Sequence, residues 1–254
     1  MTPHCAPGEP GVDTKPVYFV ADLHLTGDRP QSVDTFIRFL SATAPSGSAL
    51  YILGDLFEYW VGDDDRADHS NEVVLAAIAQ LANAGIPVFF MPGNRDFVLG
   101  ERAAKRAAIT LLPDPSVVTL FGRPTLIAHG DAYCTADFAY QTYRRRIRSR
   151  WTRSFYDLLP FGLRRTIVQS IRRRSEQGKK AKSAVIMDVE RSAIETALRA
   201  AHCDVMIHGH THRPARHEHM VDGRACVRWV LADWYENGSY LRVDASDITS
   251  IAIQ

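Results

Sequence analysis

Short apolar segments, each followed at once by polar residues, recur along this chain. Four of them are rich in Val, Ile, Leu and Phe and have the length of buried strands: Val17–Ala21, Ala49–Leu53, Pro87–Met91 and Asp204–His208. Two stretches with helical character, Val33–Thr43 and Asn71–Ala84, separate the first three segments. The first half therefore alternates strand and helix, which predicts a sheet with helices on its faces.

Further strands are predicted in the second half. These segments alternate or run apolar and are punctuated by Gly or Pro: Ser116–Phe121, Pro124–Ala128, Cys226–Ala232 and Ser239–Val243. Together with the first half they predict a layered α/β sandwich.

The stretch from about 135 to 182 breaks this rhythm. It has no strand pattern, and it holds 14 of the chain's 30 lysines and arginines. Interleaved apolar residues predict amphipathic helices with a break at Pro160–Gly162. We interpret this segment as a basic helical cap inserted into the core. Arginines that only keep a helical hairpin soluble would produce the same pattern.

Length and composition narrow the class of protein. A chain of 254 residues with 46% hydrophobic and 23% charged residues is typical of one large globular domain, which we place at residues 16–254. Residues 1–15 hold three prolines and two glycines, and we expect a disordered leader there. No apolar run approaches the roughly 20 residues that span a bilayer, so a membrane association would be peripheral. The formal net charge of +1 names no partner.

Five short polar motifs follow predicted strands. In chain order they are Asp22-Leu-His24, Gly54-Asp55, Gly93-Asn-Arg-Asp96, His129-Gly-Asp131 and Gly209-His-Thr-His212. In open α/β sheets, ligand sites form beyond the carboxyl ends of the strands, so these side chains could converge on one point. Each motif alone is weak, since Asp-x-His is more often a hydrogen-bonded strand end and Gly-Asp is an ordinary turn dipeptide. Five motifs in order, each after a strand, favour a shared site.

The residue types indicate a metal site. Carboxylates and imidazoles together are typical ligands of Mn, Fe or Zn, whereas an all-oxygen set would indicate Mg or Ca. A single carboxylate can bridge two cations, which lie about 3.5–4 Å apart in two-metal phosphatases. Asp55, which follows the small Gly54 after a predicted strand, is the candidate bridge.

The ordered motifs resemble those of the calcineurin-like metallophosphoesterases, and the match spans nearly the whole core. The resemblance implies a four-layered α/β/β/α sandwich with a helical cap inserted at about 135–182. It also implies two divalent cations held by seven side chains. One cation would bind Asp22, His24, Asp55 and His212, and the other would bind Asp55, Asn94, His129 and His210.

One departure from the family pattern changes the expected chemistry. Arg95 stands where many members have a histidine that could serve as a general acid. A guanidinium stays charged at neutral pH, but it can hold phosphate oxygens and stabilise charge in the transition state. A leaving group that needs little protonation is therefore favoured. The phosphate released from a diphosphate meets that condition far better than an alkoxide does.

Longer phrases narrow the resemblance. The stretches Gly54–Asp64, His129–Asp137 and Gly209–Pro214 resemble the UDP-2,3-diacylglucosamine hydrolases of lipid A biosynthesis. That resemblance implies hydrolysis of the pyrophosphate bond of UDP-2,3-diacylglucosamine to UMP and 2,3-diacylglucosamine 1-phosphate (lipid X). The expected mechanism is attack of a metal-activated water on the α-phosphorus, commonly with Mn²⁺. The expected location is cytoplasmic, peripheral on the cytoplasmic side of the inner membrane.

Roles for single residues follow from the same resemblance. It gives catalytic roles to Asp55, Asn94, Arg95 and His210. It gives substrate contacts to Asn94, Arg95, Asp137, His210 and, by spacing within the cap, Ser175, Lys179 and Lys182. Lys179 stands where relatives have an asparagine, and Ala136 stands where an acidic residue often occurs, so local contacts should differ there.

Two other functions fit part of the sequence. A soluble nucleotide pyrophosphatase or phosphodiesterase would use the same metal centre on a lipid-free substrate. A nucleic-acid-binding module would account for the basic, aromatic-interleaved insertion. That second reading leaves five ordered metal motifs unexplained, so no nucleic-acid partner is expected.

Overall fold

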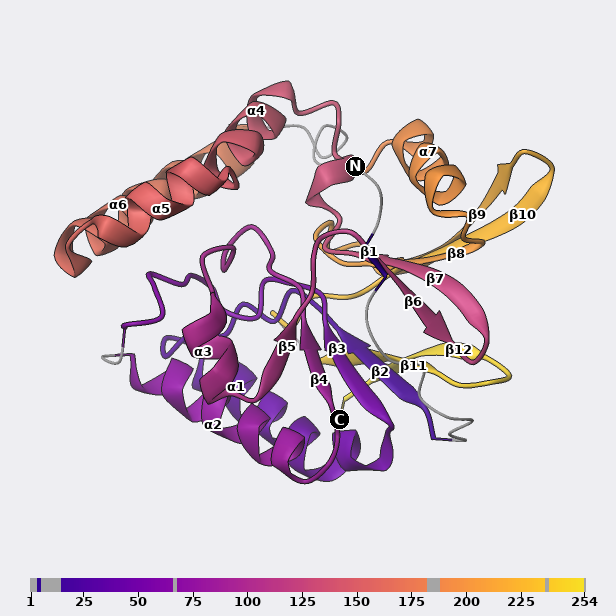
Figure 1. The fold of residues 1–254 in the computed structure, drawn as a ribbon, viewed down its shortest axis with the longest axis horizontal. Coiled ribbons are helices and arrows are strands. Elements are labelled where there is room, and N and C mark those ends of the chain that lie inside the picture. Colours follow the sequence, from indigo (N-terminus) through magenta and orange to yellow (C-terminus); the bar gives the residue numbers. More distant parts are fainter. Residues whose placement is uncertain (1–3, 6–14, 66–67, 182–187, 236–237, 254) are drawn as a thin grey trace.

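The computed structural model describes residues 4–5, 15–65, 68–181, 188–235 and 238–253. Within these residues, two six-stranded sheets form the centre of the molecule (Figure 1). The first sheet has the order β12 (Ile248–Ala252), β11 (Ser239–Val243), β2 (Val17–Val20), β3 (Ala49–Ile52), β4 (Val88–Phe90) and β5 (Ile109–Leu111). The second has the order β1 (His4–Cys5), β6 (Ser116–Leu120), β7 (Arg123–Ala128), β8 (Val205–His208), β10 (Arg224–Val230) and β9 (Ala215–Val221).

Parallel pairing brings the polar motifs to one edge of each sheet. Strands β2, β3, β4 and β5 are parallel neighbours, with Val20 opposite Ile52 and Ile52 opposite Phe90. In the second sheet β7 is parallel to β8, and Ala128 lies opposite His208. The loops that follow these strands therefore start side by side, as the sequence predicts.

Helices cover the outer faces of both sheets. On the first sheet these are α1 (Pro30–Arg38), α2 (His69–Asn83) and α3 (Glu101–Arg106), and on the second sheet α7 (Arg191–Ala201) (Figure 1). Alternation along β2 shows how one strand serves two layers, because successive side chains point to opposite faces. Tyr18 and Val20 pack with the helices, whereas Val17 and Phe19 pack between the two sheets.

A third apolar cluster lies between the second sheet and α7. Leu126 and Met206 of the sheet pack there with Ile194 and Leu198 of the helix, and all four are fully or almost fully buried. The order of layers is thus helix, sheet, sheet, helix. The predicted four-layered α/β/β/α sandwich is confirmed.

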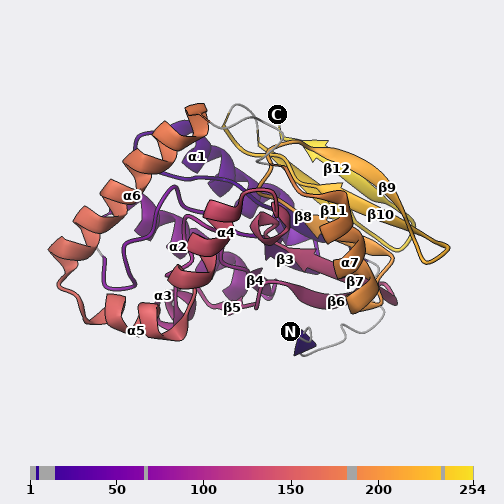
Figure 2. The same ribbon diagram turned by 90° about the horizontal axis from the view of Figure 1, so that it is seen from above.

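Three helices that lie in the chain between β7 and α7 project from the layers (Figures 1 and 2). They are α4 (Phe138–Ile147), α5 (Arg150–Leu158) and α6 (Phe161–Ala181). Asp137 and Ser149 cap the first two, because their side chains accept hydrogen bonds from the backbone of Tyr140 and Thr152. We refer to α4, α5 and α6 together as the cap.

The N-terminal segment is described only in part. His4–Cys5 forms β1 and pairs in parallel with β6, and residue 15 precedes β2. The remainder of the predicted leader lies outside the described residues.

Candidate metal centre

The predicted ligands lie on loops that are bonded to one another. The backbone N–H of Asp22 donates to the carbonyl of Gly54, and that of His24 donates to the carbonyl of Asp55. The backbone N–H of His210 donates to Asp22 Oδ2 at 2.7 Å. Loops from both sheets therefore meet at Asp22.

The backbone at these ligands adopts an unusual conformation. Five predicted ligands have φ between 48° and 72°: Asp22, His24, Asp55, His210 and His212. Glycines allow the loops to approach closely, since a Cβ at Gly93 would collide with the Asp55 carboxylate and one at Gly209 would collide with that of Asp22. The glycines of the Gly-Asn-Arg-Asp and Gly-His motifs thus allow close approach of the ligand loops.

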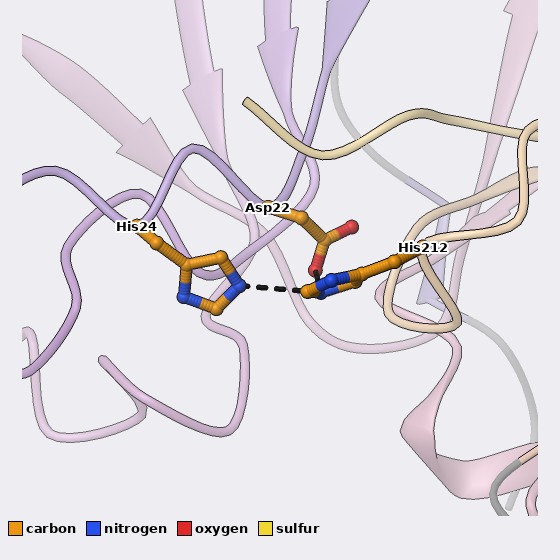
Figure 3. A group of neighbouring side chains, drawn as sticks. All are labelled: Asp22, His24 and His212. Carbon is orange, nitrogen blue, oxygen red and sulfur yellow. Dashed lines mark hydrogen bonds and ion pairs between the residues drawn. The ribbon is translucent and has the colours of Figure 1, made fainter. Parts of the chain in front are cut away.

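One group of ligands gathers around His212 (Figure 3). The Nε2 atoms of His24 and His212 are 3.2 Å apart, and Asp22 Oδ1 lies 3.5 Å from His212 Nε2. Ligand atoms of these three residues all lie within 4.8 Å of one another. Asp55 Oδ2 lies 3.9 Å from His24 Nε2, which brings the fourth predicted ligand of this set to the same place.

The second predicted set gathers around His129. Its Nε2 lies 3.8 Å from Asp55 Oδ1 and 3.1 Å from Asn94 Oδ1. The rings of His129 and His210 are 5.0 Å apart between centroids. Asp55 therefore presents one oxygen to each set, which is the arrangement that a bridging carboxylate requires. Asp22, Asp55 and His129 also lie close enough to share a cation.

Groups that the sequence motifs did not reveal lie near the Nδ1 atoms of three of the histidines. His129 Nδ1 donates to the carbonyl of Leu53 at 2.9 Å, and Asp233 lies 3.0 Å from His212 Nδ1. A carboxylate oxygen of Glu58 lies 3.6 Å from His24 Nδ1. The partners of His129 and His212 fix the tautomer and leave Nε2 for a metal, whereas Glu58 approaches His24 only at ion-pair distance. Glu58 is three residues after Asp55, and that spacing was the available signal.

Asp96 holds two ligand loops together without being a predicted ligand. Its carboxylate is fully buried and accepts the backbone N–H groups of Leu56 and Gly93, at 2.7 and 2.8 Å. Desolvation, together with the nearby Asp55, raises the pKa of Asp96 to about 7. The last residue of the Gly-Asn-Arg-Asp motif is therefore a structural brace.

Burial and charge divide the histidines into two kinds. Burial lowers the pKa of His24 to about 3 and that of His210, with a contribution from the charge of His129, to about 4. Burial also disfavours the charged form of the other two, but neighbouring carboxylates raise the pKa of His129 and of His212 to about 9. A bound cation would take the place of those protons.

The donor set fits divalent metal ions. Among the described residues, the buried Asp22 Oδ1 has no hydrogen-bond partner, although burial without one costs free energy. Burial opposes its ionisation, yet His212, whose Nε2 lies 3.5 Å from this oxygen, and the other nearby imidazoles hold the pKa of Asp22 well below its usual range. Carboxylates that lie beside imidazole nitrogens suit borderline cations such as Mn, Fe or Zn.

His208, the first imidazole of the His208–His212 run, faces elsewhere. Its Nδ1 donates to the carbonyl of Gly209 at 2.8 Å, and its Nε2 accepts from Arg228 at 3.1 Å. Both nitrogens are thereby engaged, so His208 supports the loop of His210 and His212.

Arg95 and Asn94 stand where the metal loops meet an apolar pocket beneath the cap. The backbone N–H of Arg95 donates to Asp55 Oδ1 at 2.8 Å, and its guanidinium lies 3.7 Å from Glu58. The core side of the pocket includes Trp60, Phe97 and Val98, and the cap side includes Tyr143, Ile147, Tyr156, Ile167, Val168 and Ile171. Polar side chains beside the predicted metal ligands and an apolar pocket thus adjoin.

The structure gives less information on the residues near and in the cap that are predicted to contact substrate. Asp137 caps α4 and is almost buried, and it does not line this pocket. Ser175 and Lys179 fall within α6, but their side chains, like Lys182, lie outside the described part. Their roles toward substrate stay predictions.

Proteins similar to this chain are metallophosphoesterases, in agreement with the geometry of the site. The model of the calcineurin-like phosphoesterases matches residues 15–214. A UDP-2,3-diacylglucosamine hydrolase of Aromatoleum aromaticum is 48% identical, over 90% of this chain and 93% of that protein. Proteins of the same name from Aeromonas hydrophila and Escherichia coli are 46% and 42% identical, over 88% and 92% of this chain and 92% and 97% of those proteins. This chain therefore belongs to the calcineurin-like phosphoesterases, in the family of the UDP-2,3-diacylglucosamine hydrolases.

Proposed function

We propose that this protein hydrolyses the pyrophosphate bond of UDP-2,3-diacylglucosamine, giving UMP and 2,3-diacylglucosamine 1-phosphate. The names of relatives that are 42–48% identical over about nine-tenths of the chain support this activity. The reaction is attack of water on the α-phosphorus, in a site that holds two divalent cations, taken to be Mn²⁺.

The two sets of ligands would hold those cations. When bound, such cations lower the pKa of a coordinated water and neutralise phosphoryl oxygens. Asp55 contributes one carboxylate oxygen to each set, while His24 and His129 present their Nε2 atoms from opposite sides of it. The chain itself therefore fixes the spacing of the metal centre.

Arg95 takes the role of holding and stabilising the diphosphate. Its side chain is about one-tenth exposed, so little water screens its charge. Arg95 and Asn94 line the pocket beside the predicted metal ligands, so the phosphates would lie between the cations and the cap. A guanidinium does not protonate the leaving group, and a phosphate leaving group does not require it.

The apolar pocket under the cap is the observation that most directly supports a lipid substrate. Its walls are Trp60, Phe97 and Val98 from the core and Ile147, Ile167 and Ile171 from the cap. Acyl chains bury apolar area there, at roughly 0.8 kcal/mol for each methylene. A lipid-free nucleotide would leave these walls without a function.

The cap also supports peripheral binding to the cytoplasmic face of the inner membrane. Trp151, Phe155 and Leu158 on α5 are 88%, 65% and 82% exposed. Their spacing puts them on one face of the helix, in a segment rich in arginine. Aromatic and basic residues together suit an anionic lipid surface.

Turnover of matched substrates tests this proposal. The diacylated UDP-glucosamine and its deacylated counterpart contain the same pyrophosphate bond. We expect Mn²⁺-dependent release of UMP with kcat/KM at least about a hundredfold higher for the diacylated form, which corresponds to about 2.7 kcal/mol. Equal kcat/KM for the two would instead indicate a soluble nucleotide pyrophosphatase.

A further inference from the structure

Arg144 in α4 and Arg148, which directly follows that helix, form ion pairs with buried carboxylates of the core, and their side chains are 16% and 21% exposed. Arg144 donates to Asp131 Oδ2 and to Asp114 Oδ2, both at 2.8 Å. Arg148 donates to the same Asp114 oxygen at 3.2 Å. Asp114 and Asp131 are almost completely buried, so these four residues form a desolvated ion cluster. Both guanidinium groups are therefore engaged by carboxylates of the core.

The same cluster contacts two of the loops that carry predicted ligands of the second cation. Arg148 Nη2 donates to the carbonyl of Gly93 at 3.0 Å, directly before Asn94. The other oxygen of Asp114 accepts the backbone N–H of His129 at 3.1 Å. The contacts of Arg148 thus reach the backbone beside one predicted ligand and, through Asp114, the backbone of another.

We propose that Arg148 is a positioning residue for the second cation: it fixes the backbone around Asn94 and His129 from the cap side. The ion cluster joins the end of α4 to the loops of Asn94 and His129. The start of the cap therefore helps to hold the predicted metal ligands in place. Removing the guanidinium leaves Asp114 short of a charge partner and frees the Gly93 carbonyl. Breaking a buried ion cluster in this way is costly and lets the loop move.

A second attachment of the cap supplies the matched control. Arg164 of α6 is buried, and it bonds to Asp64, to the carbonyl of Leu159 and to that of Val61. Val61 and Asp64 lie on the same connection as Asp55, but six or more residues after it, and among the described residues none of the groups bonded to Arg164 is a predicted metal ligand or adjoins one. Arg164 therefore fastens the cap without contacting the metal centre.

The test compares Arg148→Ala, Arg148→Lys and Arg164→Ala in the full chain. Mn²⁺ affinity and stoichiometry are measured by calorimetry, and turnover is measured on bis(p-nitrophenyl) phosphate and on the diacylated UDP-sugar. We expect Arg148→Ala to weaken one of two Mn²⁺ sites at least about tenfold and to lower kcat on both substrates. Arg164→Ala should keep both Mn²⁺ sites and lose turnover of the lipid substrate alone.

The lysine variant guards against loss of folding. Lysine keeps the charge beside Asp114, but its single ammonium cannot replace the planar fork that also reaches Gly93. If it folds with the wild-type circular dichroism and still binds one Mn²⁺ more weakly, positioning is supported. Wild-type Mn²⁺ affinity in a folded Arg148 variant would overturn the inference alone. A wild-type protein that binds no Mn²⁺ and turns over neither substrate would overturn the proposed function, on which this inference rests.

Discussion

Asp55 is the residue on which both predicted ligand sets depend. Its two oxygens lie 3.9 and 3.8 Å from the Nε2 atoms of His24 and His129. A carboxylate shared in this way would hold two bound cations at a fixed separation, whereas each imidazole would serve only one of them. The consequences of removing Asp55 and of removing a terminal ligand should therefore differ in kind.

We predict that Asp55→Ala abolishes both metal binding and hydrolysis, whereas His24→Ala leaves one cation bound and some activity. Metal content by elemental analysis, together with turnover of bis(p-nitrophenyl) phosphate, checks this. Two metals per chain in the folded Asp55 variant would disprove the bridge.

Arg95 is predicted to act on phosphate, since its guanidinium cannot ligate a metal. Arg95→Ala should lose most activity, about a hundredfold or more in kcat, while both cations remain. Arg95→Lys should recover little, because an ammonium lacks the planar fork. Near-normal kcat in the lysine variant would rule out bidentate binding of phosphate.

Glu58 lies 3.2 Å from Arg29 and within 4 Å of both His24 and Arg95. We predict that Glu58→Gln, which preserves the shape, weakens Mn²⁺ binding about 10–100-fold through His24. Calorimetric titration with Mn²⁺ measures this. Unchanged affinity would mean that Glu58 serves only to balance the arginines.

At the scale of elements, the sequence predicted the parts of the fold that have strong periodicity. All eight predicted strands occur with boundaries within two residues of the prediction, as at β8 (Val205–His208), because buried parallel strands are continuous apolar runs. Helix α1 begins earlier than predicted, at Pro30, and a π-helical turn, Phe39–Thr43, completes the predicted stretch.

Other elements had no such pattern. Strand β9 (Ala215–Val221) has five exposed residues in seven, so its hydrophobicity is low and its pairing with β10 determines its structure. The predicted break in the cap falls between α5 and α6, but the earlier break at Arg148–Ser149 was not predicted. The motifs also revealed no partner of the histidines, because Leu53, Glu58 and Asp233 act through position and not through a recognisable pattern.

The side of α6 that faces the core is predicted to bind acyl chains. Val168 lines the pocket, whereas its neighbour Gln169 is exposed. Val168→Glu should lower turnover of the diacylated UDP-sugar at least about tenfold, since a carboxylate would be desolvated beside the lipid. Gln169→Glu adds the same charge to the same helix and should have little effect. Both variants should retain wild-type turnover of bis(p-nitrophenyl) phosphate, and similar losses in the two would contradict the acyl site.

At the scale of the whole molecule, exposed apolar side chains concentrate on the cap. Six of the nine large hydrophobic residues that are exposed in the described structure lie there: Phe138, Trp151, Phe155, Leu158, Leu163 and Ile171. Across the described residues, no helix is both long and apolar enough to cross a membrane. A peripheral contact through the cap would bring the pocket near the membrane in which the acyl chains of the proposed substrate are embedded.

Vesicle binding tests that contact. Replacing Trp151, Phe155 and Leu158 together by Ser should lower partitioning onto phosphatidylglycerol-containing vesicles at least about tenfold, because each large side chain contributes up to about 1.5–3 kcal/mol when buried. Met220→Ser removes an apolar side chain that is 61% exposed on β9 and serves as the control. Equal binding by the triple variant and the wild type would place the membrane contact elsewhere.

The left-handed backbone at five ligand positions has a consequence for folding stability. A non-glycine residue in that region costs roughly 1 kcal/mol, so the metal-free protein gives up several kcal/mol to hold its ligands in place. His24→Gly should therefore melt about 2–4 °C above His24→Ala when both are metal-free. At the exposed helical Gln80, the same pair of substitutions should reverse in order, because glycine is the poorer helix former. The backbone conformation that orients the ligands thus lowers the free energy of unfolding of the metal-free protein. Bound metal would offset this loss.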